Sequence, residues 1–114
     1  MNKIKYSFKN DIIEYHNGAK SEIKSILCEE PYTLFNYLAS FDFNGILEGY
    51  DALKMIKENS IIEYNWWGCN LIYLESNSVI SKIILDDELG GECCYIPNND
   101  LFNLITDWIA FYKI

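Results

Sequence analysis

The chain of 114 residues contains no arginine and only one histidine, His16. Arginine is the usual bidentate ligand for phosphate and carboxylate groups, so its absence argues against nucleic-acid binding and phosphoryl transfer. His16 is the only side chain with an ordinary pKa near neutrality, and no serine or cysteine lies at an informative spacing from it. Because it lies beside the turn signal Asn17-Gly18, a surface histidine is a better interpretation than a catalytic base.

Long apolar runs are also missing. The longest are a few residues, such as Ile83–Leu85 and Trp108–Phe111, whereas a membrane-spanning helix needs about 20. No continuous apolar stretch follows the charged start of the chain, as a signal peptide requires. Half of the residues are apolar and 16% are aromatic. We therefore expect a single folded domain over residues 1–114, located in the cytoplasm and not bound to a membrane.

The motifs of metal, cofactor and nucleophile sites are scarce as well. Cys28 and Cys69 are isolated, and the adjacent Cys93-Cys94 pair would point to opposite faces of a strand. No Cys-x-x-Cys is present, so four reduced, partly buried cysteines are favoured over a zinc site. Gly90-Gly91 fits no phosphate-binding loop, and Asp86–Glu88 lacks the alternating spacing of a calcium loop. We expect no catalytic residues, no cofactor and no metal.

Acidic residues are abundant and unevenly distributed. The first 24 residues hold five lysines and three acidic residues, whereas the chain from Ser25 onward holds fourteen acidic residues and four lysines. The net charge of −8 thus divides into about +2 and about −10. An acidic surface attracts cationic partners and repels nucleic acid and anionic lipid. The alternative is a solvated surface that only keeps the protein soluble.

The first half of the chain predicts strands followed by helices. Ile4–Lys9 alternates with period two, and Asp11–Tyr15 is interpreted as its returning partner before the turn at Asn17-Gly18. Ser21–Glu30 fits either a short helix or an extended segment. Pro31 opens a helix with an apolar stripe at Leu34, Tyr37, Leu38 and Phe41. A second helix is expected from Ile46 to Glu58, with Leu47, Tyr50, Leu53 and Ile56 directed inward.

The second half predicts a sheet and a final helix. Strands are expected at residues 60–67, 69–75, 79–85 and 92–96, and their short connections indicate an antiparallel meander. Pro97 then begins a helix whose apolar stripe consists of Leu101, Leu104, Ile105, Trp108, Ile109 and Tyr112. The fold class is therefore α+β: an antiparallel meander of four or more strands, packed by a C-terminal helix and preceded by two helices.

Aromatic and acidic side chains gather on the predicted sheet. Adjacent residues of a strand face opposite ways, so either one of Trp66 and Trp67 is exposed or both sheet faces are covered. Residues 75–100 carry a net charge of about −5. Acidic groups steer a basic partner, and desolvated aromatic rings slow its dissociation. The candidate partner-binding residues are Trp67, Tyr73, Glu75, Asp86, Asp87, Glu88, Glu92 and Tyr95. For Asp86–Glu88, the alternative is an exposed hairpin connection.

Residues 50–111 resemble small immunity proteins of bacterial contact-dependent growth inhibition and polymorphic toxin systems. The resemblance rests on Tyr50-x-Ala52-Leu53, on Trp66-x-x-Cys69-x-Leu71 and on Tyr95-Ile96-Pro97-x-x-Asp100-Leu101-x-x-Leu104-Ile105-x-Asp107-Trp108-Ile109-x-Phe111. It implies a cytoplasmic inhibitor that neutralises a cognate toxin domain, commonly a basic nuclease. The acidic charge and the missing motifs agree with this and favour a protein that is not an enzyme and binds neither nucleic acid nor membrane. The alternatives are a small carboxylate- or metal-dependent enzyme and a general acidic protein-interaction domain.

Overall fold

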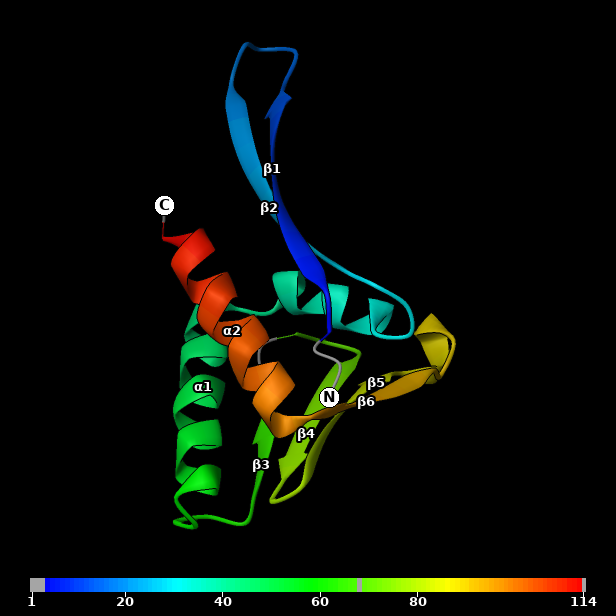
Figure 1. Ribbon diagram of the computed structural model, residues 1–114. Coiled ribbons are helices and arrows are strands. Elements are labelled where there is room, and N and C mark those ends of the chain that lie inside the picture. Colours follow the sequence, from blue (N-terminus) through cyan, green and yellow to red (C-terminus); the bar gives the residue numbers. More distant parts are fainter. Residues whose placement is uncertain (1–3, 68, 114) are drawn as a thin grey trace.

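The computed structural model describes residues 4–67 and 69–113 and has an α+β fold (Figure 1). A two-stranded hairpin comes first, followed by a 3-10 helix, a long helix, a four-stranded sheet and a C-terminal helix. In chain order the elements are β1 (Tyr6–Glu14), β2 (Lys20–Cys28), the 3-10 helix η1 (Thr33–Ser40), α1 (Phe43–Lys57), β3 (Glu63–Trp66), β4 (Ile72–Asn77), β5 (Ile80–Leu85), the 3-10 helix η2 (Asp87–Leu89), β6 (Cys93–Pro97) and α2 (Asn98–Tyr112).

The four-stranded sheet is an antiparallel meander with the strand order β3-β4-β5-β6. Turn residues separate its alternating segments, and the connections between them are short, so consecutive strands lie antiparallel beside each other. Together with η1 and α1 before the sheet and α2 after it, this confirms the predicted fold class. Within the described residues, no helix is long and apolar enough to cross a membrane.

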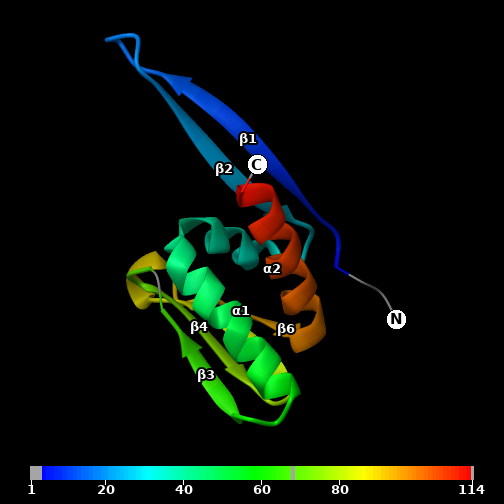
Figure 2. The same cartoon turned by 90° about the vertical axis from the view of Figure 1, so that its left-hand side faces the viewer.

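Both long helices lie on the same side of this sheet (Figure 2). In β4, buried and exposed side chains alternate strictly, and β5 follows the same period. The inward side chains of the strands, among them Leu74, Ile83 and Ile96, join the helices in one apolar core. The outward side chains form a second face, which we call the open face of the sheet.

The C-terminal helix α2 covers the middle of the core as predicted. Leu101, Leu104 and Ile105 are completely buried, and Trp108 is almost so. Farther along the predicted stripe, Tyr112 is partly exposed, but its ring stacks on Phe43 of α1 with a centroid distance of 4.2 Å. The sequence periodicity therefore located the face of α2 correctly.

The N-terminal hairpin corrects one prediction. Asp11–Tyr15 is not a returning strand, because its first four residues continue β1, which pairs with β2 from Tyr6↔Cys28 to Glu14↔Lys20. The reversal takes place at Asn17-Gly18, where Gly18 has φ 83° and the Asn17 side chain accepts a hydrogen bond from Ala19 N at 2.9 Å. Of the two readings of Ser21–Glu30, the extended one is correct for the residues in β2.

The helix after Pro31 is the 3-10 helix η1 rather than an α-helix. Its buried residues are Phe35 and Leu38, with Phe41 directly after it, whereas the predicted stripe omitted Phe35 and included the partly exposed Tyr37. A 3-10 helix has three residues per turn, so side chains three apart share a face. This tighter repeat explains why the α-helical spacing missed Phe35 and included Tyr37, although Leu38 and Phe41 are buried as predicted.

The strand expected from residue 60 begins only at Glu63. Asn59 has φ 62°, and Ser60 N donates to Met55 O at 2.8 Å, so the chain first folds back over the end of α1. Ile62 is 75% exposed and does not join the sheet. The β-branched pair Ile61-Ile62 suggested a strand, but the end of α1 determines the path of the chain here.

Candidate protein-binding surface

One row of side chains crosses all four strands on the open face. Asn65 of β3 pairs with Glu75 of β4, Glu75 with Lys82 of β5, and Lys82 with Tyr95 of β6. Because residues opposite each other in an antiparallel sheet point to the same side, these four side chains are neighbours. They contribute to a shallow depression of about 430 Å³ on this face.

Lys82 places a positive charge inside this row. Its Nζ lies 5.3 Å from the centre of the Tyr95 ring, which is the geometry of a cation–π contact. Tyr95 is the main cause of the raised pKa of Lys82, and Glu75 adds a smaller contribution. The open face is therefore mixed in charge: the protonated Lys82 of β5 lies between Glu75 of β4 and Tyr95 of β6, and Glu63 lies farther out on β3.

Two exposed tyrosines lie on this face: Tyr95 ends the row, and Tyr73 lies two residues before Glu75 on β4. Tyr73 of β4 is 47% exposed and Tyr95 of β6 is 51% exposed. Tyr73 lies opposite Ile84, which is itself opposite Cys93. A rigid sheet thus presents two large amphipathic rings to solvent, and tyrosine is enriched among the residues that dominate protein–protein binding energy. Of the residues predicted from the sequence, Tyr73, Glu75 and Tyr95 share this face.

The predicted acidic residues Asp86, Asp87, Glu88 and Glu92 lie in the connection between β5 and β6. Asp87, Glu88 and Glu92 are exposed, whereas Asp86 is half-buried. The Asp86 carboxylate accepts a hydrogen bond from Glu88 N at 3.2 Å, and its own N–H donates to Leu71 O at 2.8 Å. Asp86 therefore shapes the connection, and the other three supply its exposed negative charge.

Of the two alternatives for Trp66 and Trp67, the one in which a single tryptophan is exposed is correct. Trp66 is buried in the core, and Trp67 is 53% exposed. The Trp67 indole Nε1 donates to Glu48 Oε2 of α1 at 2.6 Å. This bond holds Trp67 where the edge strand β3 meets α1. Glu48 had no signal in the sequence, because only the packing of α1 against β3 brings the two residues together.

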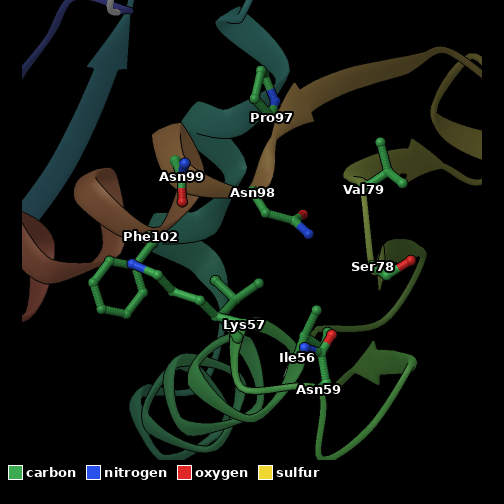
Figure 3. A pocket seen from close by; sticks show the side chains of 10 residues that line it. Ile56, Lys57, Asn59, Ser78, Val79, Pro97, Asn98, Asn99 and Phe102 are labelled. Carbon is green, nitrogen blue, oxygen red and sulfur yellow. The ribbon is translucent and has the colours of Figure 1, made fainter.

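A separate cavity of about 360 Å³ lies between the end of α1, the β4–β5 turn and the start of α2 (Figure 3). Lys57 and Asn59, Ser78 and Val79, and Asn98 surround it from these three directions. Its lining contains no histidine, cysteine or carboxylate that would supply an acid, a base or a nucleophile. The sequence did not predict this cavity, since its walls come from three distant segments.

The titratable groups elsewhere do not assemble into a reactive cluster in the part of the chain that the structure describes. Among residues 4–67 and 69–113, no three histidine, cysteine or acidic side chains lie together as metal ligands would. His16 is exposed in the β1–β2 turn. Cys28, Cys69, Cys93 and Cys94 are free thiols, and burial raises the pKa of the Cys28 thiol to about 11.

No family model, curated protein or solved structure matches this chain.

Proposed function

We propose that this chain is a cytoplasmic immunity protein that binds a cognate toxin domain through the open face of the sheet and the β5–β6 connection. The observation that carries the proposal is the exposure of Tyr73 and Tyr95 on one face of a sheet in which the β5–β6 connection carries the exposed acidic residues Asp87 and Glu88. The resemblance of residues 50–111 to immunity proteins supplies the class of partner.

Two physical effects, one on association and one on dissociation, support a basic partner. Exposed acidic groups raise the rate of encounter with a positively charged surface, and this effect weakens as salt screens it. Large aromatic side chains lose little conformational entropy when they are buried, so Tyr73 and Tyr95 would slow dissociation. A nuclease must present cationic groups to its substrate backbone. An acidic protein bound over those groups would exclude the nucleic acid and inhibit the enzyme.

The experiment is co-expression of the toxin domain encoded beside this chain, with growth and binding kinetics as readouts. The double variant Tyr73→Ala/Tyr95→Ala should dissociate about tenfold faster or more, because two central aromatic contacts are removed. Growth rescue should fall accordingly. Tyr15→Ala is the matched control, since Tyr15 is 52% exposed but lies at the tip of the β1–β2 hairpin.

Two results would contradict different parts of the proposal. If the double variant rescues growth and dissociates like the wild-type protein, the open face is not the binding surface. If the wild-type protein neither binds the neighbouring toxin domain nor restores growth, the immunity function itself is wrong. A thermal melt of each variant ensures that a loss of binding is not a loss of folding.

A further inference from the structure

The β1–β2 hairpin extends away from the rest of the molecule (Figures 1 and 2), and only its base is covered. At the base, the Phe8 ring lies 5.5 Å from Trp108 and 5.2 Å from Phe111, measured between ring centres. Toward the tip, Ile12 is 66% exposed, and Ile13 and Ile23 are also exposed. A two-stranded hairpin by itself is marginally stable in water, and exposed apolar patches mark interaction sites.

Among the residues that the structure describes, no strand lies beside the outer edge of β1, so hydrogen-bonding groups point outward there. Glu29 N donates to Lys5 O at 3.0 Å and Tyr15 N donates to Ala19 O at 2.8 Å, so the odd-numbered residues of β1 bond toward β2. The even-numbered residues therefore direct their N–H and C=O groups to the other side. On β2, the outer edge is occupied at its base, because Cys28 N donates to Asn36 Oδ1 of η1 at 2.6 Å.

We propose that β1 pairs with β1 of a second copy of this chain, antiparallel and with Asn10 on the two-fold axis. The free edge requires even-numbered residues to face even-numbered residues. Centring the pair on Lys9 would oppose two lysines, and centring it on Asp11 would oppose two aspartates. Centring it on Asn10 places Lys9 opposite Asp11 twice. Opposite charges facing each other across a sheet are stabilising, whereas like charges are destabilising, so of these three registers the one centred on Asn10 is favoured.

The same register covers Ile12, the most exposed of the three isoleucines toward the tip of the hairpin. It places Ile12 opposite Phe8 of the second copy, and the reverse contact follows from the symmetry. Phe8 belongs to the ring cluster with Trp108 and Phe111, so each Ile12 would extend the apolar cluster of the other copy. The two hairpins would together form a four-stranded sheet, which is a more stable unit than either hairpin alone.

Charge also favours contact through the hairpins over contact through the bodies. The hairpin from Tyr6 to Cys28 contains three lysines and three acidic residues, whereas the remainder of the chain is strongly acidic. An antiparallel β1–β1 pair leaves the two acidic bodies at opposite ends of the dimer. Within one copy, Lys9 Nζ lies 3.6 Å from Asp11 Oδ1, and both side chains are exposed. The dimer would join two such pairs into one cluster of four alternating charges.

This interface does not depend on the proposed binding of a toxin. Sedimentation equilibrium of the full chain over a range of concentrations measures it directly, and wild-type protein should dimerise. Lys9→Asp and Asp11→Lys should each weaken dimerisation about tenfold or more, because each opposes like charges at two positions. An equimolar mixture of the two variants should form a heterodimer, since aspartates on one copy would then face lysines on the other. Lys57→Asp and Glu58→Lys in and after α1 are controls with the same changes in net charge.

Asn10→Pro provides a second test. Proline removes the N–H that points to the free edge and leaves the β1–β2 bonds in place, so the fold should persist while the dimer is lost. Circular dichroism confirms folding of every variant. A wild-type protein that stays monomeric up to high concentration overturns the proposal. Dimers that withstand both charge variants, or variants that fail to associate when they are mixed, overturn it as well.

Discussion

Gly49 of α1 lies directly against the indole ring of Trp66 of β3. A Cβ atom at position 49 would overlap ring carbons of Trp66, so only glycine permits this approach of helix and strand. At the other end of the indole, Nε1 donates to Ser76 Oγ at 2.9 Å, which in turn lies 2.7 Å from Ser81 Oγ. The indole is thus fixed between the backbone of α1 and a buried hydroxyl pair under the sheet.

Gly49→Ala is expected to destabilise the protein by about 1–3 kcal/mol, the usual range for overpacking a core. Alanine otherwise stabilises a helix relative to glycine by about 0.5–1 kcal/mol, so a net loss would identify the clash as the cause. Urea denaturation measures the free energy of unfolding. In a Trp66→Ala background the same substitution should become neutral or stabilising. Equal stability of Gly49→Ala and the wild-type protein would contradict the described contact.

Trp108→Ala should destabilise the protein by about 3–5 kcal/mol, as other truncations of buried aromatic residues do. Trp108 is almost completely buried and contacts the rings of Phe8, Phe111 and Tyr112. Domains of this size have total stabilities of roughly 5–15 kcal/mol, so the loss should be large in a thermal melt. Tyr112→Ala, in the same helix but partly exposed, is the control and should lose less. A Trp108→Ala melting temperature within a degree or two of wild type would refute this packing.

Reversal of Asp87, Glu88 and Glu92 to lysine should slow association with the toxin domain and reduce its dependence on salt. The three side chains are exposed, so they act on the encounter more than on the bound complex. Asp86 is left unchanged because it shapes the connection. Reversal of Asp42, Asp51 and Glu58, which lie in or beside α1, is the control with the same change in charge. Stopped-flow association at several salt concentrations measures the effect. Equal association rates and salt dependence for the two triple variants would show that the β5–β6 connection has no specific role.

The raised pKa of the Cys28 thiol predicts a loss of stability in alkaline solution. Burial, with a smaller contribution from Cys94, raises the pKa of Cys28 from 9.0 to about 11 in the folded protein. Between these values the unfolded chain has released the proton that the folded protein retains, so the free energy of unfolding falls as the pH rises. Cys28→Ala removes this pH-dependent contribution to the free energy of unfolding.

Urea denaturation at intervals from about pH 8 to about pH 11 tests the prediction. The stability of the wild-type protein relative to Cys28→Ala should decline over this range. A constant difference would show that the Cys28 thiol titrates alike in the folded and unfolded states.

The meander and α2 could be predicted from the sequence because their periodicity coincides with burial on one face. In β4, the alternation of Ile72, Tyr73, Leu74 and Glu75 follows the structure residue by residue. In β1, the adjacent Ile12 and Ile13 break the alternation because the outer hairpin lies against no core. Because the outer part of β1 has no buried face, its sequence lacks the alternation that normally identifies the inner face of a strand.

The candidate surface was only partly predictable for a similar reason. Alternation within a strand places Tyr73 and Glu75 on one face, and this depends on local sequence alone. The contact of Lys82 with Tyr95 depends on the register between β5 and β6, and that of Trp67 with Glu48 on how α1 packs against β3. Such relationships arise between separate segments of the chain, and no pattern within either segment encodes them.

The alternation along β4 and β5 also separates two kinds of evolutionary constraint. Ile72, Leu74 and Ile83 support the core, and changes there disturb the whole fold. Tyr73 and Glu75 point the other way, and substitutions of such exposed residues usually change the folding free energy little. Successive mutations could therefore remodel one side of this sheet for a new partner while the other side preserves the scaffold. Recognition and folding can diverge at different rates within the same two strands.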